Sequence, residues 1–135
     1  MIQFFVNAKP MSTQSGTVVN AGGRRIPLRR NPQFSKACKV EAIKSKNATG
    51  WNMLEGPVVM GVTIFMQRPK KLKSKWAMTG ADILNIIKGP MDAWQGVVYK
   101  DDRQVVECHI SKQWAGDGWA PGLLMDFREA DETFA

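Results

Sequence analysis

The sequence has little cysteine and histidine. Its two cysteines, Cys38 and Cys108, lie far apart, and His109 is the single histidine. No CxxC motif or Cys/His cluster is present, so the sequence indicates neither a disulfide framework nor a thiolate zinc site. Cys108 and His109 are neighbours, but adjacent residues of a strand point to opposite faces. We expect both to be ordinary strand residues.

Long hydrophobic runs are also missing. No apolar stretch approaches the roughly 18 residues of a membrane-spanning helix. The opening residues, MIQFFVNAKP, have neither the basic n-region nor the long apolar h-region of a secretory signal. We therefore expect no membrane partner and a cytoplasmic location in a bacterial host cell.

Acidic residues are scarce in the first half of the chain. Residues 1–75 hold 14 of the 19 basic residues and only two of the 12 acidic ones, within a net charge of +7. Such a basic segment indicates a polyanionic partner, DNA or RNA first. The remaining carboxylates, in residues 76–135, would repel phosphate unless a divalent cation lies between them. A metal-dependent nuclease needs this combination, and an uneven charge without function is the alternative.

The composition supports one folded domain. The chain has 135 residues, of which 44% are hydrophobic and 23% charged. Hydrophobic periodicity predicts two helices and four main strands. The helices are expected at 33–47 and 82–95, and the strands at 2–6, 58–67, 103–113 and 123–127. This order indicates a single α+β domain with a mixed sheet of about four strands.

Two local features qualify this outline. Pro90 cannot donate a hydrogen bond to the carbonyl of Ile86, so we expect the second helix to kink or restart there. Residues 128–135 are polar and are expected to form a frayed tail.

Two basic segments separate the predicted elements. Residues 11–33 are rich in Gly, Ser, Thr, Asn and Pro and predict a flexible loop that becomes ordered on DNA. Residues 68–75, RPKKLKSK, leave a strand and end at Trp76. Solvated loops without a ligand are the alternative for both segments. The candidate phosphate-binding side chains are Arg24, Arg25, Arg29, Arg30, Arg68, Lys70, Lys71, Lys73 and Lys75.

Acidic residues and a lysine stand around the second helix. Asp82 heads the helix, Lys88 follows six residues later, and Asp101-Asp102 lies at a loop-to-strand junction. Carboxylates that meet at such ends can bind Mg²⁺, and paired ions can activate water against a phosphodiester. Lys88 could neutralise charge that develops on the phosphate. From these residues alone, Asp82 as a simple helix cap and Asp101-Asp102 as a solvated turn are the favoured interpretations.

The stretch 80–112, GADILNIIKGPMDAWQGVVYKDDRQVVECHISK, resembles the signature of the RusA family of Holliday-junction endonucleases. That signature reads K-P-D-x-D-N-L-x-K-x-x-x-D-A-L-N-G, followed by a D-D-x-Q-V-V strand. IQFFVNAKP and GPVVMGVTIFMQRPK are similar to the family's opening strand and to the strand that precedes the acidic motif. The residues that match the signature are Asp82, Asn85, Lys88, Asp92, Ala93, Gly96, Asp101, Asp102, Gln104, Val105 and Val106.

The resemblance implies a homodimer that cuts four-way DNA junctions symmetrically with Mg²⁺, or with Mn²⁺ in its place. By this resemblance Asp82 and Asp102 bind the metal, Lys88 is the catalytic lysine and Asp101 is an auxiliary acid. The basic loops would hold the arms of the junction through phosphates. A function in DNA recombination and repair, and an origin in a phage or prophage, are further expectations.

The sequence departs from the family pattern inside the motif. Leu84 stands where the family has a second aspartate, and Gly80-Ala81 stands where it has Lys-Pro. Leucine cannot ligate a cation, so one of three expected acids is missing. Glu107 and Asp92 are the candidates to replace it, although we expect Asp92 to face away from Asp82. The alternatives are therefore a RusA-like protein that binds branched DNA without cutting it, and a basic protein with another partner such as RNA.

Overall fold

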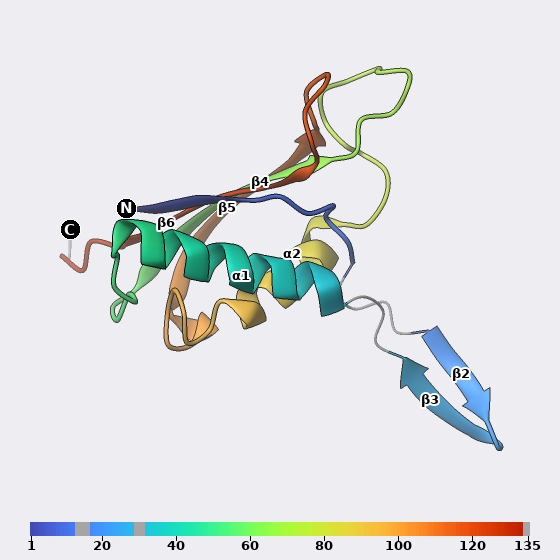
Figure 1. Ribbon diagram of the computed structural model, residues 1–135, viewed down its shortest axis with the longest axis horizontal. Coiled ribbons are helices and arrows are strands. Elements are labelled where there is room, and N and C mark those ends of the chain that lie inside the picture. The colour runs from blue at the N-terminus through green and yellow to red at the C-terminus, as the bar shows by residue number, and fades with distance from the viewer. Residues whose placement is uncertain (13–16, 29–31, 134–135) are drawn as a thin grey trace.

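One face of a four-stranded sheet is covered by two helices (Figure 1). The computed structural model describes residues 1–12, 17–28 and 32–133, with side chains throughout except at 17–21, 25–28 and 32. The elements are β1 (Ile2–Val6), β2 (Thr17–Ala21), β3 (Arg24–Leu28), α1 (Pro32–Thr49), β4 (Val58–Met66), α2 (Ile83–Ala93), the 3-10 turn η1 (Asp102–Gln104), β5 (Val105–Trp114) and β6 (Gly122–Glu129). This arrangement confirms the predicted α+β fold with about four strands and two main helices.

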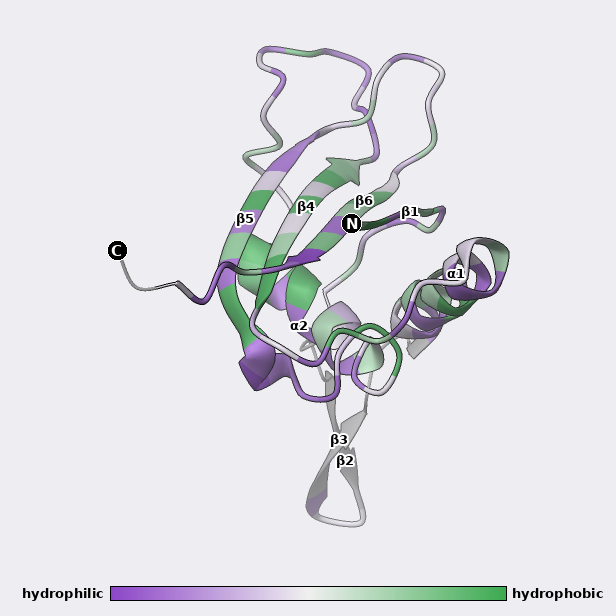
Figure 2. Ribbon diagram, turned by 90° about the vertical axis from the view of Figure 1, so that its left-hand side faces the viewer, coloured by the Kyte–Doolittle hydropathy of each residue, from purple (hydrophilic) through white to green (hydrophobic). Residues whose placement is uncertain are grey.

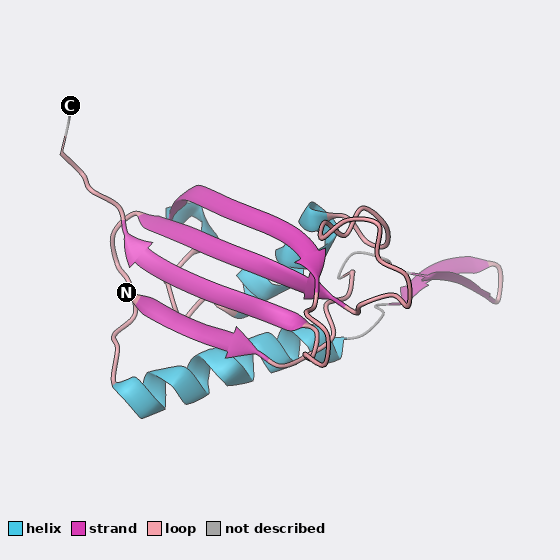
Figure 3. Ribbon diagram, turned by 90° about the horizontal axis from the view of Figure 1, so that it is seen from above, coloured by secondary structure: helices cyan, strands magenta, loops and turns pink. Residues whose placement is uncertain are grey.

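The sheet is mixed, with the order β1-β6-β4-β5. β4 and β5 run parallel, whereas β6 lies antiparallel to both β1 and β4. Figure 3 shows the four strands side by side with both helices on the same side of the sheet. Because β4 is central, five of the seven residues of Val58–Ile64 are buried. β5 is an edge strand, which explains why its first half is largely exposed.

The core lies between the sheet and the helices. Ile2, Phe4 and Val6 alternate with exposed residues along β1, the pattern of a strand with one buried face. The ring of Trp94 packs edge-on against Phe127 with centroids 5.3 Å apart, and its Nε1 donates to the carbonyl of Cys38 at 3.0 Å. This bond ties the end of α2 to α1. Hydrophobic residues colour much of β1, β4 and α2 in Figure 2.

α2 does not restart at Pro90, so this one of the two expected outcomes is wrong, while a kink there stays a prediction. The helix runs unbroken over Ile83–Ala93 with Pro90 inside it. Proline removes only the hydrogen bond to the carbonyl of Ile86, and the next turn is closed again where Trp94 N–H donates to the carbonyl of Pro90 at 3.0 Å. Ile86, Ile87 and Pro90 are all buried, so packing against the core holds the helix together.

The predicted loop over residues 11–33 contains a β-hairpin. β2 and β3 pair antiparallel, and Gly22-Gly23 forms the two-residue turn between them. These glycines have φ of 59° and 78°, the left-handed conformation that a tight hairpin turn of this kind requires. The hairpin projects from the body in Figure 1. The β-branched run Thr17-Val18-Val19 before two glycines was the signal for it.

The last strand is longer than predicted. β6 continues to Glu129 because it pairs with β4 up to Val58, so the expected polar tail begins inside the sheet. Ala130 N–H also donates to the carbonyl of Pro57 at 2.7 Å. None of the described helices has the length and apolar character needed to cross a bilayer.

Candidate nucleic-acid interface and acidic site

Asp82 caps the N-terminus of α2. Its Oδ1 accepts a hydrogen bond from Asn85 N–H at 2.8 Å, and its Oδ2 accepts from Asn85 Nδ2 at 3.1 Å. The extended backbone of Asp82 (φ −75°, ψ 163°) is the conformation expected of an N-cap residue. Asp82 therefore has a structural function at the helix end, and both of its oxygens already have a partner.

Lys112 reaches this helix end from β5. Its Nζ donates to the carbonyls of Ala81 at 2.9 Å and Thr79 at 3.3 Å, which fixes the segment that leads into Asp82. Sequence reasoning missed this lysine because it lies outside the two basic segments. The position of Lys112 in the strand could have identified it. Lys112 pairs with the buried Ile64, so its side chain faces the helices.

The side chain of Gln104 holds the Asp101-Asp102 turn, called the acidic turn below, in place. Its Oε1 accepts hydrogen bonds from the backbone N–H groups of Lys100 (2.8 Å) and Asp101 (2.9 Å). Its Nε2 donates to the carbonyls of Leu54 and Gly56, both at 3.0 Å. The glutamine of the D-D-x-Q motif thus attaches the turn to the segment that precedes β4.

Asp101 and Asp102 differ sharply although they are adjacent. Arg103 donates to both oxygens of Asp101 through its side chain, at 3.2 and 3.0 Å, and its backbone N–H donates to Oδ1 at 2.9 Å. These bonds lower the pKa of Asp101 to about 2. Loss of solvent, with the charges of Asp101 and Asp92 nearby, raises the pKa of Asp102 above its usual 3.8. Asp102 is consequently the carboxylate whose charge is poorly compensated.

Asp102 interacts with residues at the C-terminal end of α2 and just beyond it. Asp92 contributes to the raised pKa of Asp102, and Gln95 Oε1 accepts a hydrogen bond from Asp102 N–H at 3.2 Å. Leu84, Lys88 and Asp92 follow one another at four-residue intervals and all three are exposed, so they share one face of the helix. The charge of Asp92 therefore acts on Asp102.

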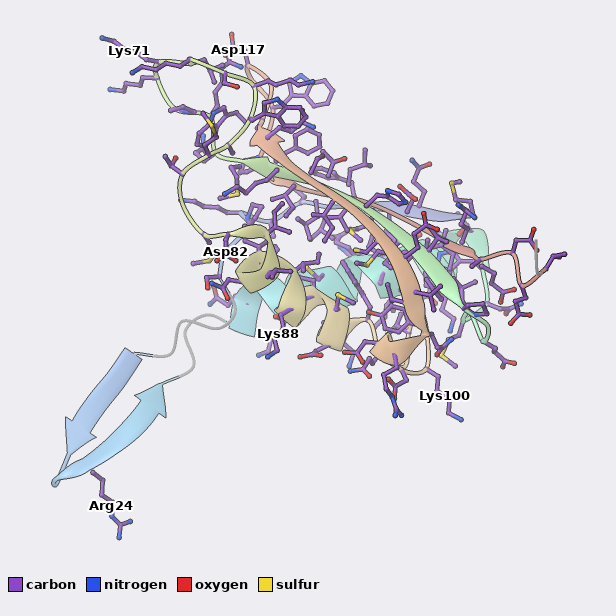
Figure 4. All side chains as sticks on the ribbon, turned by 180° about the vertical axis from the view of Figure 1, so that it is seen from behind. Arg24, Lys71, Asp82, Lys88, Lys100 and Asp117 are labelled. Atoms are coloured by element: carbon purple, nitrogen blue, oxygen red, sulfur yellow. The ribbon has the colours of Figure 1, made fainter. Side chains whose placement is uncertain are left out.

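Asp82 and Asp102 lie towards different ends of α2. Asp82 caps one end of α2, and the ten residues from Asp82 to Asp92 correspond to about 15 Å of helix. Figure 4 shows Asp82 and Lys100 far apart, with Lys88 on the helix between them. In the described ranges, no three His, Cys, Asp or Glu side chains are grouped to hold a metal ion. A Mg²⁺ ion needs oxygens at about 2.0–2.1 Å, and the binding of one ion by Asp82 and Asp102 stays a prediction.

The basic residues gather towards the Asp82 end. The side chains of Arg68, Lys70, Lys71, Lys73 and Lys75 are all exposed. In Figure 4 Lys71 lies beyond Asp82 on one side and Arg24, exposed on the hairpin, on the other. Arg25 lies on β3 without a described side chain, and Arg29 and Arg30 lie outside the described residues. The positive charge therefore flanks Asp82, whereas the Asp101-Asp102 turn lies at the other end of α2.

The open face of the sheet carries a second group of polar residues. Glu107 Oε1 and His109 Nε2 lie 2.7 Å apart on β5. On β6, Asp126 lies over Gly61, where a Cβ atom would come within 2.5 Å of its Oδ2. His109, Asp126 and Gly61 line a shallow hollow in which Gly61 leaves room for the carboxylate. Neither Cys108 nor His109 belongs to a group of metal-binding side chains among the described residues.

Comparison with known proteins supports the resemblance. The family model for endodeoxyribonuclease RusA matches residues 7–120, a range that includes both basic segments, α2 and the acidic turn. The chain is also similar to the uncharacterized protein YqaN of Bacillus subtilis (strain 168), with 33% identity over 96 residues, which cover 62% of this chain and 68% of that protein. The match spans most of the chain, and the protein therefore belongs to the RusA endodeoxyribonuclease family.

Proposed function

We propose that this protein is a Mg²⁺-dependent, structure-specific endodeoxyribonuclease that resolves four-way junctions in DNA recombination and repair. The observation that carries the proposal is the family match over residues 7–120. The family is one of Holliday-junction-resolvase-like nucleases, and its members generally depend on a divalent metal. A homodimer would suit this substrate because a two-fold axis matches the symmetry of a junction with two cleavage sites.

The charge distribution supports binding through the DNA backbone. Five exposed cations lie within residues 68–75, and Arg24 lies on the projecting hairpin. Lysine and arginine that contact phosphates release counterions, which gives affinity without base specificity. Two basic segments separated by the Asp82 end of α2 could hold different arms of a branched molecule. Shape would then determine which DNA is bound.

The acidic residues and Lys88 would each have a different role in cleavage. We propose Asp102 as a catalytic carboxylate because its raised pKa marks a charge that a bound cation would stabilise. Lys88 is exposed on the same face of α2 as Asp92 and can reach a phosphate bound there. Asp101, held by Arg103, would position the turn. Asp82 is the proposed metal-binding residue from the family pattern, and its Oδ2, which accepts one hydrogen bond from Asn85 Nδ2, keeps a second lone pair for a cation.

A second candidate function is a branched-DNA-binding protein that does not cut. Leu84 occupies the position of the missing aspartate and its side chain is 74% exposed, so no core packing explains the substitution. The described residues also lack a group of three acids. Binding through the basic segments needs neither feature.

One experiment separates these functions. Purified protein is incubated with a synthetic four-way junction and Mg²⁺ or Mn²⁺, beside the variant Asp102→Asn, and the same junction is used in a gel shift against linear duplex. Paired nicks that disappear in the variant would establish the nuclease. Selective binding without nicks would establish the second candidate. Equal binding to junction and duplex, without nicks, would contradict both.

A further inference from the structure

Two loops leave the same end of the sheet and are joined there. β4 and β5 are parallel, so the loop of residues 67–82 and the loop of residues 115–121 begin side by side. Trp114 N–H donates to the carbonyl of Lys75 at 2.9 Å, and Ala77 N–H donates to the carbonyl of Lys112 at 3.1 Å. The segment around Trp76 therefore extends the edge of β5 as a short antiparallel strand.

Each of these loops displays a tryptophan. Trp119 is 76% exposed and Trp76 is 46% exposed, whereas Trp94 in the core is fully buried. The ring of Trp119 lies against Gly116, where a Cβ atom would be 3.4 Å from Cγ of the indole. Trp76 is opposite Gln113 in the pairing, and Lys75 Nζ lies 4.4 Å from the centroid of its ring. Both rings are thus held at the surface by local contacts, at a place where large apolar side chains are normally withdrawn from water.

The charge around the two rings selects among ligands. The two loops carry the five cations of residues 68–75. Their acidic residues are Asp82, at the end of the first loop, and Asp117, in the second. A second copy of this surface would bring like charges together, which disfavours self-association through it. Exposed aromatic rings beside lysines are the arrangement that binds unpaired bases, because every base has a face on which a ring can stack. In an intact duplex those faces are already stacked and out of reach.

We propose that Trp76 and Trp119, with the adjacent lysines, form a stacking site for unpaired bases at the branch point of DNA. That the unpaired bases belong to branched DNA rests on the proposed function. That the two rings stack on unpaired bases does not rest on it. The site lies at the basic end of the molecule, and Figure 4 shows Lys71 and Asp117 close together at the tip of the two loops.

The test compares the double variant Trp76→Ala/Trp119→Ala with the Trp76→Phe/Trp119→Phe variant in the full chain. Affinity is measured for an oligo-dT single strand, a four-way junction and a linear duplex. Stacking contributes enough per base that the alanine variant should lose at least about fivefold in affinity for the single strand and the junction, with little change for duplex. The phenylalanine variant should retain most of the binding. Met78→Ala, which removes another exposed apolar side chain from the same loop, is the matched control and should bind as wild type.

Several results would overturn the stacking site. Unchanged affinity of the alanine variant would do so, and so would an equal loss for all three DNAs. A change of molecular mass in solution would instead identify the tryptophans as subunit contacts. Wild-type protein that binds junction no better than duplex would contradict the proposed function alone, because the single-strand comparison still tests stacking.

Discussion

The side-chain oxygen of Gln104 accepts a hydrogen bond from the backbone N–H of Asp101 at 2.9 Å. The same oxygen accepts from Lys100 N–H, while the amide nitrogen donates to two carbonyls before β4. All four hydrogen-bonding positions of a glutamine side chain are therefore filled. The glutamine in the D-D-x-Q motif is what fixes the two aspartates in space.

We expect Gln104→Ala to destabilise the protein by about 1–3 kcal/mol, because two N–H groups and two carbonyls lose their partner in a partly buried place. Chemical denaturation checks this value. Gln67→Ala is the control, since Gln67 is exposed and follows the end of β4. If the two variants are equally stable, Gln104 does not hold the turn.

The sequence predicted the sheet, the two helices and the family, because periodicity and a contiguous motif are local signals. It did not separate Asp101 from Asp102. That difference depends on loss of solvent around Asp102, on Arg103, which hydrogen-bonds to the side chain of Asp101, and on the charge of Asp92 from another element. Asp92 was expected to face away from Asp82, and its position beside Asp102 could be known only once the chain after α2 was placed.

Lys112 shows the same limit at the other end of α2. Its contacts with the carbonyls of Thr79 and Ala81 join residues 31 or more positions apart, which no local pattern contains. The hairpin at 17–28, by contrast, had a local signal in its Gly-Gly turn. Composition outweighed that signal, because residues rich in Gly, Ser and Asn are also typical of loops.

The pKa values of Asp101 and Asp102 should lie on opposite sides of the ordinary value of 3.8. With its pKa lowered to about 2, Asp101 contributes stability that is present above pH 3.8 and is lost as the pH falls towards 2. With its pKa raised, Asp102 contributes stability at low pH that is lost as the pH rises through its folded pKa. Carboxyl ¹³C shifts followed by NMR check both. Asp92→Asn should lower the pKa of Asp102 and leave that of Asp101 in place, and an Asp102 pKa equal to that of wild type would exclude Asp92 as a cause.

We expect Leu84→Asp to increase junction cleavage at least about tenfold, equivalent to about 1.4 kcal/mol of transition-state stabilisation. The side chain is 74% exposed, so the change should alter folding stability by no more than about 0.5 kcal/mol. Nicking rates with Mg²⁺ are the measurement. Leu84→Asn, which has the same shape without the charge, should not increase the rate. An equal rate in wild type and both variants would show that the missing acid does not limit cleavage.

The two cysteines should differ in reactivity. Cys38 is fully buried in α1, and burial raises the pKa of its thiol to about 12, whereas Cys108 is exposed on β5. Because the thiolate is the reactive form, a thiol-specific reagent at about pH 8 should modify one cysteine of the native protein and the second only after denaturation. Cys108→Ser should then show no reaction before denaturation. Rapid labelling of that variant would mean that α1 opens readily from the sheet.

The salt dependence of DNA binding tests where the phosphates lie. Each phosphate contact contributes a slope of about 0.9 to the fall of log affinity with log salt concentration, so Lys70→Ala/Lys71→Ala/Lys73→Ala should reduce the slope by about 2.7 if all three bind phosphates. The matched control is Lys36→Ala/Lys39→Ala/Lys44→Ala, which removes the same charge from exposed positions of α1. Its slope should remain near that of wild type. Equal reductions in both variants would mean that overall charge, and not the loop after β4, governs binding, since non-specific attraction depends on the total field of the protein.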